Sequence, residues 1–243
     1  MTDPRHPQPD LIEITAASPN AAVLRTAYDK VLRPSFPVTQ LASFEVFVTE
    51  LSESPEEAVL VAVDGDSPVG VAVDYPMPEL GLGLLAYAAT RPGHRSRGIG
   101  GFLMRALRER WAAGPVDLVL AEVEDPRFHA DTSENRSVAR LRFYERHGAE
   151  VLMVPWVQPG LDGNDRVPGM LLLRVWVRGP AETVPATTLV RWADVYFSTE
   201  EGGMPEDATF LALRARVTER SAVAVAPVGD ATRVLPLEAP TGG

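Results

Sequence analysis

The 243-residue sequence contains no cysteine. This absence excludes a disulfide framework, a thiolate zinc site and a cysteine nucleophile. The sequence also lacks any run of about 18 apolar residues that could cross a membrane. Its first ten residues carry three prolines and no apolar centre of the kind a signal peptide needs. These absences favour a cytoplasmic protein without a membrane partner, and no metal ligand is assigned.

Positive charge is in short supply. Lysine and arginine together number 23 against 33 acidic residues, which gives a formal net charge of −10. Such a surplus of negative charge opposes binding to nucleic acid or to an anionic membrane surface, so neither partner is expected. The hydrophobic fraction of 45% is that of an ordinary globular protein. The length allows one large domain, or one domain with an appendage.

The order of periodic segments predicts a mixed α/β (α+β) fold. Two amphipathic helices are expected before residue 55, because apolar residues recur there at helical spacing. An antiparallel meander is expected next, with strands over 58–63, 69–73 and 84–90. Later elements are a helix from residue 99, a strand over 118–124, a helix over 137–147, and strands over 150–157 and 170–177.

Beyond residue 179 the periodicity weakens to two helices, over 187–197 and 208–217. We therefore predict a main domain with a C-terminal appendage. The expected divisions are a disordered N-terminus over 1–10, the main domain over 11–178, a helical extension over 179–220 and a tail over 221–243.

A loop rich in glycine and arginine follows the third predicted strand and opens a helix. Helix N-termini present unpaired amides and a partial positive charge, and glycines let the backbone approach a pyrophosphate closely. The arginines reverse the sign of the charge locally in an acidic protein. The loop could also be a plain strand-to-helix turn with a solvated basic edge. Its candidate phosphate-binding residues are Arg95, Arg97, Gly98, Ile99, Gly100 and Gly101.

Two other nucleotide motifs do not fit this loop. A P-loop needs a lysine and a hydroxyl residue after its last glycine, where Phe102 and Leu103 stand, so that motif is excluded. The dinucleotide fingerprint needs glycine or alanine at position 103 and belongs to a first βα unit. A loop placed after a meander therefore disfavours a dinucleotide site.

Two segments resemble a known family, the GNAT superfamily of N-acetyltransferases. Residues 95–100 match its R-x-x-G-x-G pyrophosphate signature, and residues 143–149, Phe-Tyr-Glu-Arg-His-Gly-Ala, resemble its second motif, F-Y-E-x-x-G-F. The resemblance covers roughly residues 11–177. It implies the acyl-CoA N-acyltransferase fold, a mixed and mostly antiparallel twisted sheet with splayed central parallel strands, flanked by helices and here followed by the helical extension.

The resemblance also implies a reaction. Such an enzyme transfers acetyl from acetyl-CoA to a primary amine, here expected on a small molecule, by direct attack. The strand before the loop would pair with the cofactor arm at Ala88, Ala89 and Thr90. Tyr144 matches the family's tyrosine acid, although Tyr144 and Leu141 are also spaced to share a buried helix face.

The general base is not supplied by the resemblance. Many members carry a glutamate on the strand before the loop, but residues 84–90 contain no acidic residue. Glu122 and Glu124 are the best substitutes, since they lie two apart at a strand end and share a face. They could accept a proton or attract a cationic amine, or they could be an ordinary solvated strand end. Ser137 replaces the family's asparagine and is expected to cap a helix, while Asn135 could reach the cofactor arm.

Three functions of different classes are compatible with these residues. The first is the acetyltransferase. The second is a regulatory module that binds acyl-CoA without turnover, which the missing strand glutamate and Ser137 would favour. The third is a structural dimerising domain. The segment from residue 181 could close over the acceptor site or form a homodimer contact.

Overall fold

The computed structural model describes residues 8–131 and 136–237. The chain divides into two compact units. The first unit comprises Met1–Pro78 and Gly83–Val116, and the second comprises Glu79–Leu82 and Asp117–Gly243. Within the described ranges, no helix is long and apolar enough to cross a membrane.

The first unit is built on an antiparallel meander. Its strands lie in the order β1 (Asp10–Ile14), β2 (Ala58–Asp64), β3 (Ser67–Met77) and, from Gly83 onward, β4 (Leu82–Thr90). β1 with β2 and β2 with β3 are antiparallel pairs. The strand alternation that predicts this meander therefore identifies it correctly, with β3 longer than expected.

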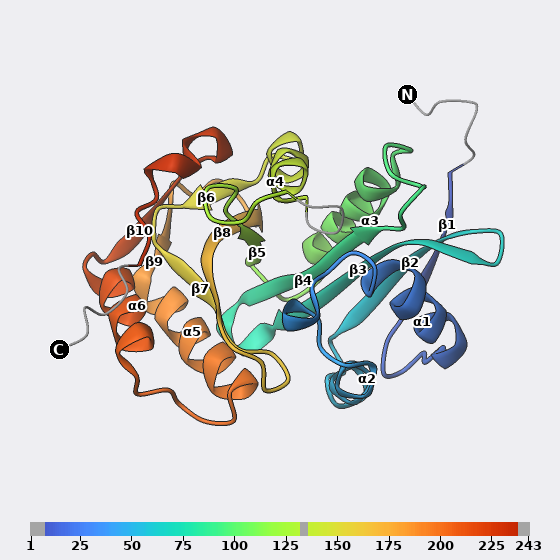
Figure 1. The fold of residues 1–243 in the computed structure, drawn as a ribbon, viewed down its shortest axis with the longest axis horizontal. Coiled ribbons are helices and arrows are strands. Elements are labelled where there is room, and N and C mark those ends of the chain that lie inside the picture. Colours follow the sequence, from blue (N-terminus) through green and yellow to red (C-terminus); the bar gives the residue numbers. More distant parts are fainter. Residues whose placement is uncertain (1–7, 132–135, 238–243) are drawn as a thin grey trace. The chain divides into compact units, whose positions relative to one another are not determined.

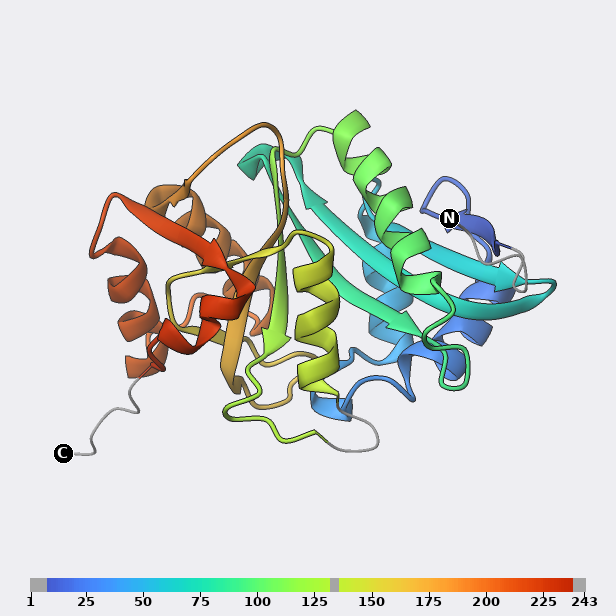
Figure 2. The same cartoon turned by 90° about the horizontal axis from the view of Figure 1, so that it is seen from above.

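Helices cover both faces of this sheet, as Figures 1 and 2 show. On one face lie α1 (Ala21–Ala27), its π-helical continuation Tyr28–Leu32, and α2 (Phe44–Glu53). Leu24 and Phe47 of these helices join valines of β2 and β3 in one buried cluster. The helical pair predicted from the N-terminal apolar stripes thus contributes to this buried cluster.

The other face is covered by α3 (Ile99–Ala113), which starts at the predicted residue. A Cβ atom placed on Gly70 of β3 would lie 2.5 Å from Cγ2 of Ile99, so only glycine lets α3 pack this closely. Near its other end, Trp111 Nε1 donates a 2.9 Å hydrogen bond to Asp74 of β3. The helix that carries the phosphate loop is thus fixed to the sheet near both ends.

The second unit is also built on β-strands. Its strands run in the order β5, β8, β6, β10 and β9, with β7 paired to β8, and the recorded pairs are antiparallel. The bounds are β5 Leu118–Glu124, β6 Glu150–Leu152, β7 Trp156–Gln158, β8 Val167–Val177, β9 Thr183–Pro185 and β10 Ala222–Pro227. The strand predicted over 150–157 is two short strands, β6 and β7.

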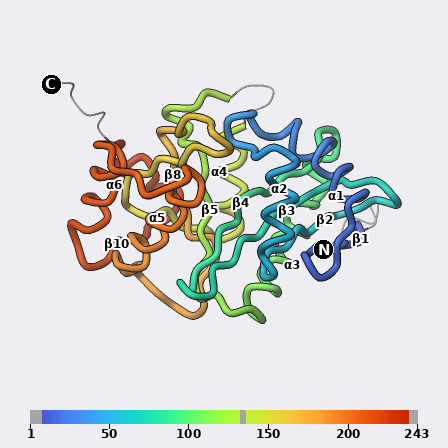
Figure 3. Tube along the Cα trace, turned by 90° about the horizontal axis from the view of Figure 1, so that it is seen from below, coloured from blue at the N-terminus to red at the C-terminus, as the bar shows by residue number. Residues whose placement is uncertain are grey.

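Three α-helices accompany this sheet: α4 (Ser137–Arg146), α5 (Ala186–Glu200) and α6 (Ala208–Thr218). α5 and α6 pack together through Phe197 and Phe210, whose ring centroids are 4.9 Å apart, and Figure 3 follows their paths. The mixed α/β class with mostly antiparallel strands and flanking helices is confirmed.

The C-terminal segment differs from the expected tail. β10 pairs with β6 and with β9, and the 3-10 helix Val228–Arg233 follows it. The run Ala-Val-Ala-Val-Ala has the alternation of a strand, but it is short and its partner lies about 75 residues earlier in the chain, where Val225 faces Leu152. A local pattern of this length cannot reveal such a partner.

Candidate functional site

The predicted phosphate loop lies in the first unit, between β4 and α3. Gly98 is the N-cap residue and adopts a left-handed conformation, with φ of 81° and ψ of 0°. Phe102 N–H donates to the Gly98 carbonyl at 3.0 Å. The amides of Ile99, Gly100 and Gly101 therefore precede the helical hydrogen-bond ladder. Open space lies in front of Gly98, since a Cβ atom there would meet nothing within 4 Å. These features fit a pyrophosphate.

One arginine beside the loop is bonded to a neighbouring strand, and another is exposed to solvent. Arg91 donates to Ser67 Oγ at 2.8 Å and so ties the loop to the start of β3. Arg95 is half-buried, whereas Arg97 is exposed. Positive charge beside a helix N-terminus strengthens attraction for an anion. Arg97 is the arginine best placed to meet a ligand from solvent.

The residues expected to pair with a cofactor arm end the strand before this loop. Ala88, Ala89 and Thr90 are the last residues of β4, and all three are half-buried. They belong to the same unit as the loop. The structure therefore keeps the strand end, the loop and the N-terminus of α3 in one continuous segment.

Glu122 of β5 is held by three hydrogen-bond donors in the second unit. Trp156 Nε1 donates to one carboxylate oxygen at 2.5 Å, and Gln158 Nε2 at 3.0 Å and the Tyr196 hydroxyl at 2.8 Å donate to the other. Burial raises the pKa of the Glu122 carboxyl to about 7, while the three donors act in the opposite direction. Glu122 is therefore not a solvated strand end.

Two of these donors belong to an aromatic stack. The Trp156 ring stacks on Trp192 with centroids 4.9 Å apart, and Trp192 stacks on Tyr196 at 5.3 Å. The stack fixes the direction of both donors toward Glu122. Sequence reasoning missed these residues, and the only local signal was that Trp156 and Gln158, two apart on a strand, point to one face.

Glu124 has a different environment from Glu122. It is fully buried, and it forms an ion pair with Arg140 of α4, at 2.6 Å. The guanidinium of Arg140 engages the Glu124 carboxylate inside the fold. Glu124 thus joins β5 to α4, and Glu122 is the better candidate for the base.

Tyr144 lies on α4, one turn after Arg140, and is 5% exposed. Burial raises the pKa of the Tyr144 phenol to about 12, and Arg140 lowers it only in part. The phenol therefore keeps its proton at neutral pH. Such a group can serve as an acid but not as a base.

The start of α4 differs from the prediction. Ser137 does not cap the helix: its hydroxyl donates to the His129 carbonyl at 2.9 Å and to Asp131 Oδ1 at 2.8 Å. Asp131 Oδ1 also accepts a hydrogen bond from Val138 N–H at 3.2 Å, so Asp131 takes the capping role from the preceding loop. Asn135 lies outside the described residues.

Comparisons with known proteins find a similar domain and a similar fold. Residues 55–148 match the model of the acetyltransferase (GNAT) domain. This range contains both the phosphate loop and Tyr144. No curated protein matches the sequence.

Solved structures resemble the fold at low sequence identity. A GNAT-family protein from Bacteroides thetaiotaomicron has a TM-score of 0.56 and 21% identity, over 77% of this chain and 98% of that chain. The aminoglycoside 6'-N-acetyltransferase from Enterococcus faecium has a TM-score of 0.47 and 19% identity, over 70% and 99%. The ribosomal-protein-S18-alanine N-acetyltransferase from Escherichia coli has a TM-score of 0.47 and 16% identity, over 70% and 97%. Residues 55–148 are thus similar to the acetyltransferase (GNAT) domain, and the likeness to the solved structures is one of fold.

Proposed function

We propose that the protein transfers the acetyl group of acetyl-CoA to a primary amine of a small molecule. The observation that carries the proposal is the loop at the N-terminus of α3, where Gly98 is left-handed and three amides precede the helical ladder. The amides of residues 98–101 and the Arg97 side chain would hold the pyrophosphate. The end of β4, at Ala88, Ala89 and Thr90, would bind the rest of the cofactor arm.

Glu122 is the proposed general base. An amine acceptor is an ammonium ion at neutral pH and must lose a proton before its nitrogen can attack. A carboxyl with a pKa of about 7 is partly ionised at that pH and is basic enough to take this proton, directly or through water. A carboxylate has about four lone-pair sites. Three are used by its donors, which leaves one to accept the proton.

Tyr144 is the proposed acid. Bound acetyl-CoA would supply an activated thioester, in which a C–N bond forms to the amine as the C–S bond breaks. The leaving sulfur needs a proton, and the protonated Tyr144 phenol can donate one. Glu122 takes one ammonium proton before the attack and passes it to solvent. The nitrogen loses a second proton as the amide forms, and this proton restores the Tyr144 phenol, so the protons balance over one turnover.

The phosphate loop can be tested by its charge. Gly100→Glu should weaken CoA binding by about 10-fold or more, because a carboxylate among the loop amides repels the pyrophosphate. Helix folding should not suffer, because acidic residues are favourable in a first turn. Isothermal titration calorimetry with CoA measures the effect. Gly100→Gln, which adds the same bulk without charge, is the matched control, and equal losses in both variants would exclude the electrostatic explanation.

The role of Tyr144 as the acid can be tested by removing its phenol oxygen. Tyr144→Phe should lower kcat by about 10²-fold or more, because the departing thiolate is no longer protonated. Thiol release from acetyl-CoA, followed with a panel of primary amines, measures it. Tyr28→Phe is the control: its buried hydroxyl donates to the Ala42 carbonyl at 2.7 Å, so its loss should affect stability and leave kcat unchanged. Unchanged turnover in Tyr144→Phe would remove Tyr144 from the mechanism.

The same assays separate the alternatives. CoA binding without thiol release for any amine would favour an acyl-CoA-binding regulatory module. Absence of both binding and release would favour a structural domain.

A further inference from the structure

A cavity of about 400 Å³ lies wholly within the second unit. Its walls come from the loop after β5, from β7, from the start of β8 and from the C-terminal residues 234–237. The volume is within the range of about 300–1,000 Å³ that is usual for small-molecule sites. Most of the side chains that line it are apolar, including Phe128, Trp156, Met170 and Leu235.

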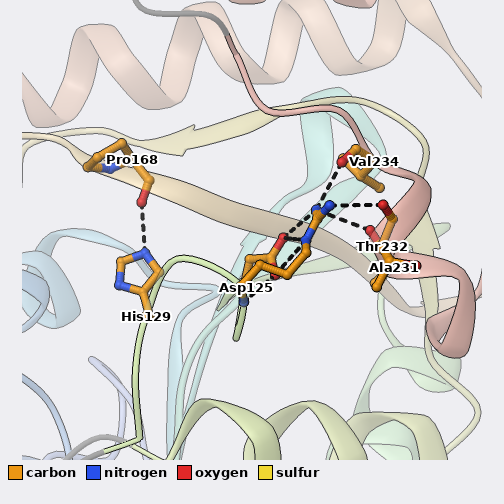
Figure 4. A network of polar contacts seen from close by, with 7 residues as sticks. Asp125, His129, Pro168, Ala231, Thr232 and Val234 are labelled. Atoms are coloured by element: carbon orange, nitrogen blue, oxygen red, sulfur yellow. Dashed lines mark hydrogen bonds and ion pairs between the residues drawn. The ribbon is translucent and has the colours of Figure 1, made fainter.

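Asp125, Arg127 and His129 at its border each have a partner within the protein (Figure 4). Arg127 forms an ion pair with Asp125, at 2.6 Å. His129 Nε2 lies 2.8 Å from the Pro168 carbonyl oxygen. These pairs leave the border with little capacity to bind a ligand rich in hydroxyl groups, because such a ligand would lose its own hydrogen bonds to water. The cavity therefore favours an apolar occupant.

The C-terminal wall is held in place by Arg127. Its guanidinium donates to the carbonyls of Thr232 and Val234, each at 2.9 Å, and of Ala231 at 3.3 Å (Figure 4). A planar guanidinium with several donors fixes a backbone segment more closely than a single hydrogen bond would. Leu235, next in the chain, is thereby positioned at the cavity while 74% exposed.

A single side chain, that of Trp156, lies between the cavity and the proposed base Glu122. Trp156 lines the cavity, and its Nε1 donates to Glu122 at 2.5 Å. We propose that the cavity holds the apolar body of the acceptor, so that the preferred substrates are primary amines on an aliphatic or aromatic skeleton. This inference rests on the proposed function and names its substrate class.

Kinetics with two amines test the inference. We expect kcat/KM to be at least about 10-fold higher for 2-phenylethylamine than for glucosamine, which carries its amine among hydroxyl groups. Leu235→Arg should raise KM for 2-phenylethylamine by about 10-fold, since a cation at the cavity border replaces an apolar contact and repels the ammonium. KM for acetyl-CoA should stay unchanged. Leu211→Arg is the matched control, because Leu211 is an exposed leucine of α6 outside the cavity lining.

Binding can be followed without turnover, because Trp156 both lines the cavity and stacks on Trp192. A saturable change in tryptophan fluorescence with 2-phenylethylamine, weakened by Leu235→Arg and not by Leu211→Arg, supports the cavity as the amine site even if no acetyl transfer occurs. Acetyl transfer that prefers glucosamine, with identical kinetics in the two arginine variants, overturns the inference and leaves the acetyltransferase intact.

Discussion

Glu122→Gln is expected to lower kcat by about 10²- to 10⁴-fold, the usual contribution of a general base. If Glu122 is the base, as proposed, its ionised form is the active one, so the rate of the unmodified protein should rise with pH through about 7 and then level off. The variant should lose this rise as well as the rate, because an amide does not titrate. Steady-state kinetics from pH 5.5 to 9 measure both effects.

Two further variants make this test specific. Glu124→Gln removes the neighbouring carboxylate, which is paired with Arg140. This variant should be less stable but should keep the rise of the rate with pH. Tyr196→Phe removes one hydrogen-bond donor to Glu122. The loss of this donor raises the pKa of Glu122 further and should move the rise of the rate to higher pH. A Glu122→Gln enzyme with an unaltered pH profile would show that another group accepts the proton.

A second large effect is expected from Glu57, in the first unit. Glu57 is 1% exposed, and neither carboxylate oxygen has a hydrogen-bond partner among the described residues. The nearby Tyr75 hydroxyl donates to Glu50 instead, at 2.8 Å. Burial, reinforced by the charge of Glu50, raises the pKa of Glu57 to about 8, and Tyr75 opposes this only in part. The folded protein therefore holds a proton on Glu57 at neutral pH.

The sign of the stability effect follows from this raised pKa. In the unfolded chain Glu57 ionises near its ordinary value of 4.5, whereas in the folded state it ionises at about 8. The free energy of unfolding should therefore fall as pH rises between these two values. Glu57→Gln, which stays neutral, should be more stable than the unmodified protein at pH 9, by on the order of 5 kcal/mol. At pH 4 the two should be nearly equal.

Urea unfolding at pH 4, 7 and 9 measures this difference. Glu56→Gln is the control, because Glu56 is the adjacent residue and is exposed, so the same substitution there should leave the pH dependence unchanged. Parallel stability curves for Glu57→Gln and the unmodified protein would show that Glu57 is ionised in the folded state.

Local features of this protein could be predicted from sequence, and distant ones could not. The start of α3 at residue 99 and the loop before it follow from glycine spacing and helical periodicity, which act over a few residues. The surroundings of Glu122 depend on Trp156 and Tyr196, which are 34 and 74 positions away. A strand pattern shows which face a carboxylate shares, but not what covers that face.

The capping of α4 illustrates the same limit at short range. Serine is a favoured N-cap residue. The hydrogen bond from the Val138 N–H of the helix is nevertheless accepted by Asp131, six residues before Ser137. Cap preferences apply to residues adjacent to the first turn. Asp131 is not adjacent to that turn in sequence, so local preferences do not identify it as the acceptor.

The donors that surround Glu122 have a consequence for the evolution of this enzyme. The matched domain ends at residue 148, whereas Trp156, Gln158 and Tyr196 all lie after it. The segment that matches the acetyltransferase domain therefore does not contain the groups that raise or lower the pKa of the proposed base. If residues 149–237 are exchanged between two related proteins, the pH optimum of the rate should follow the exchanged segment, although the phosphate loop is unchanged.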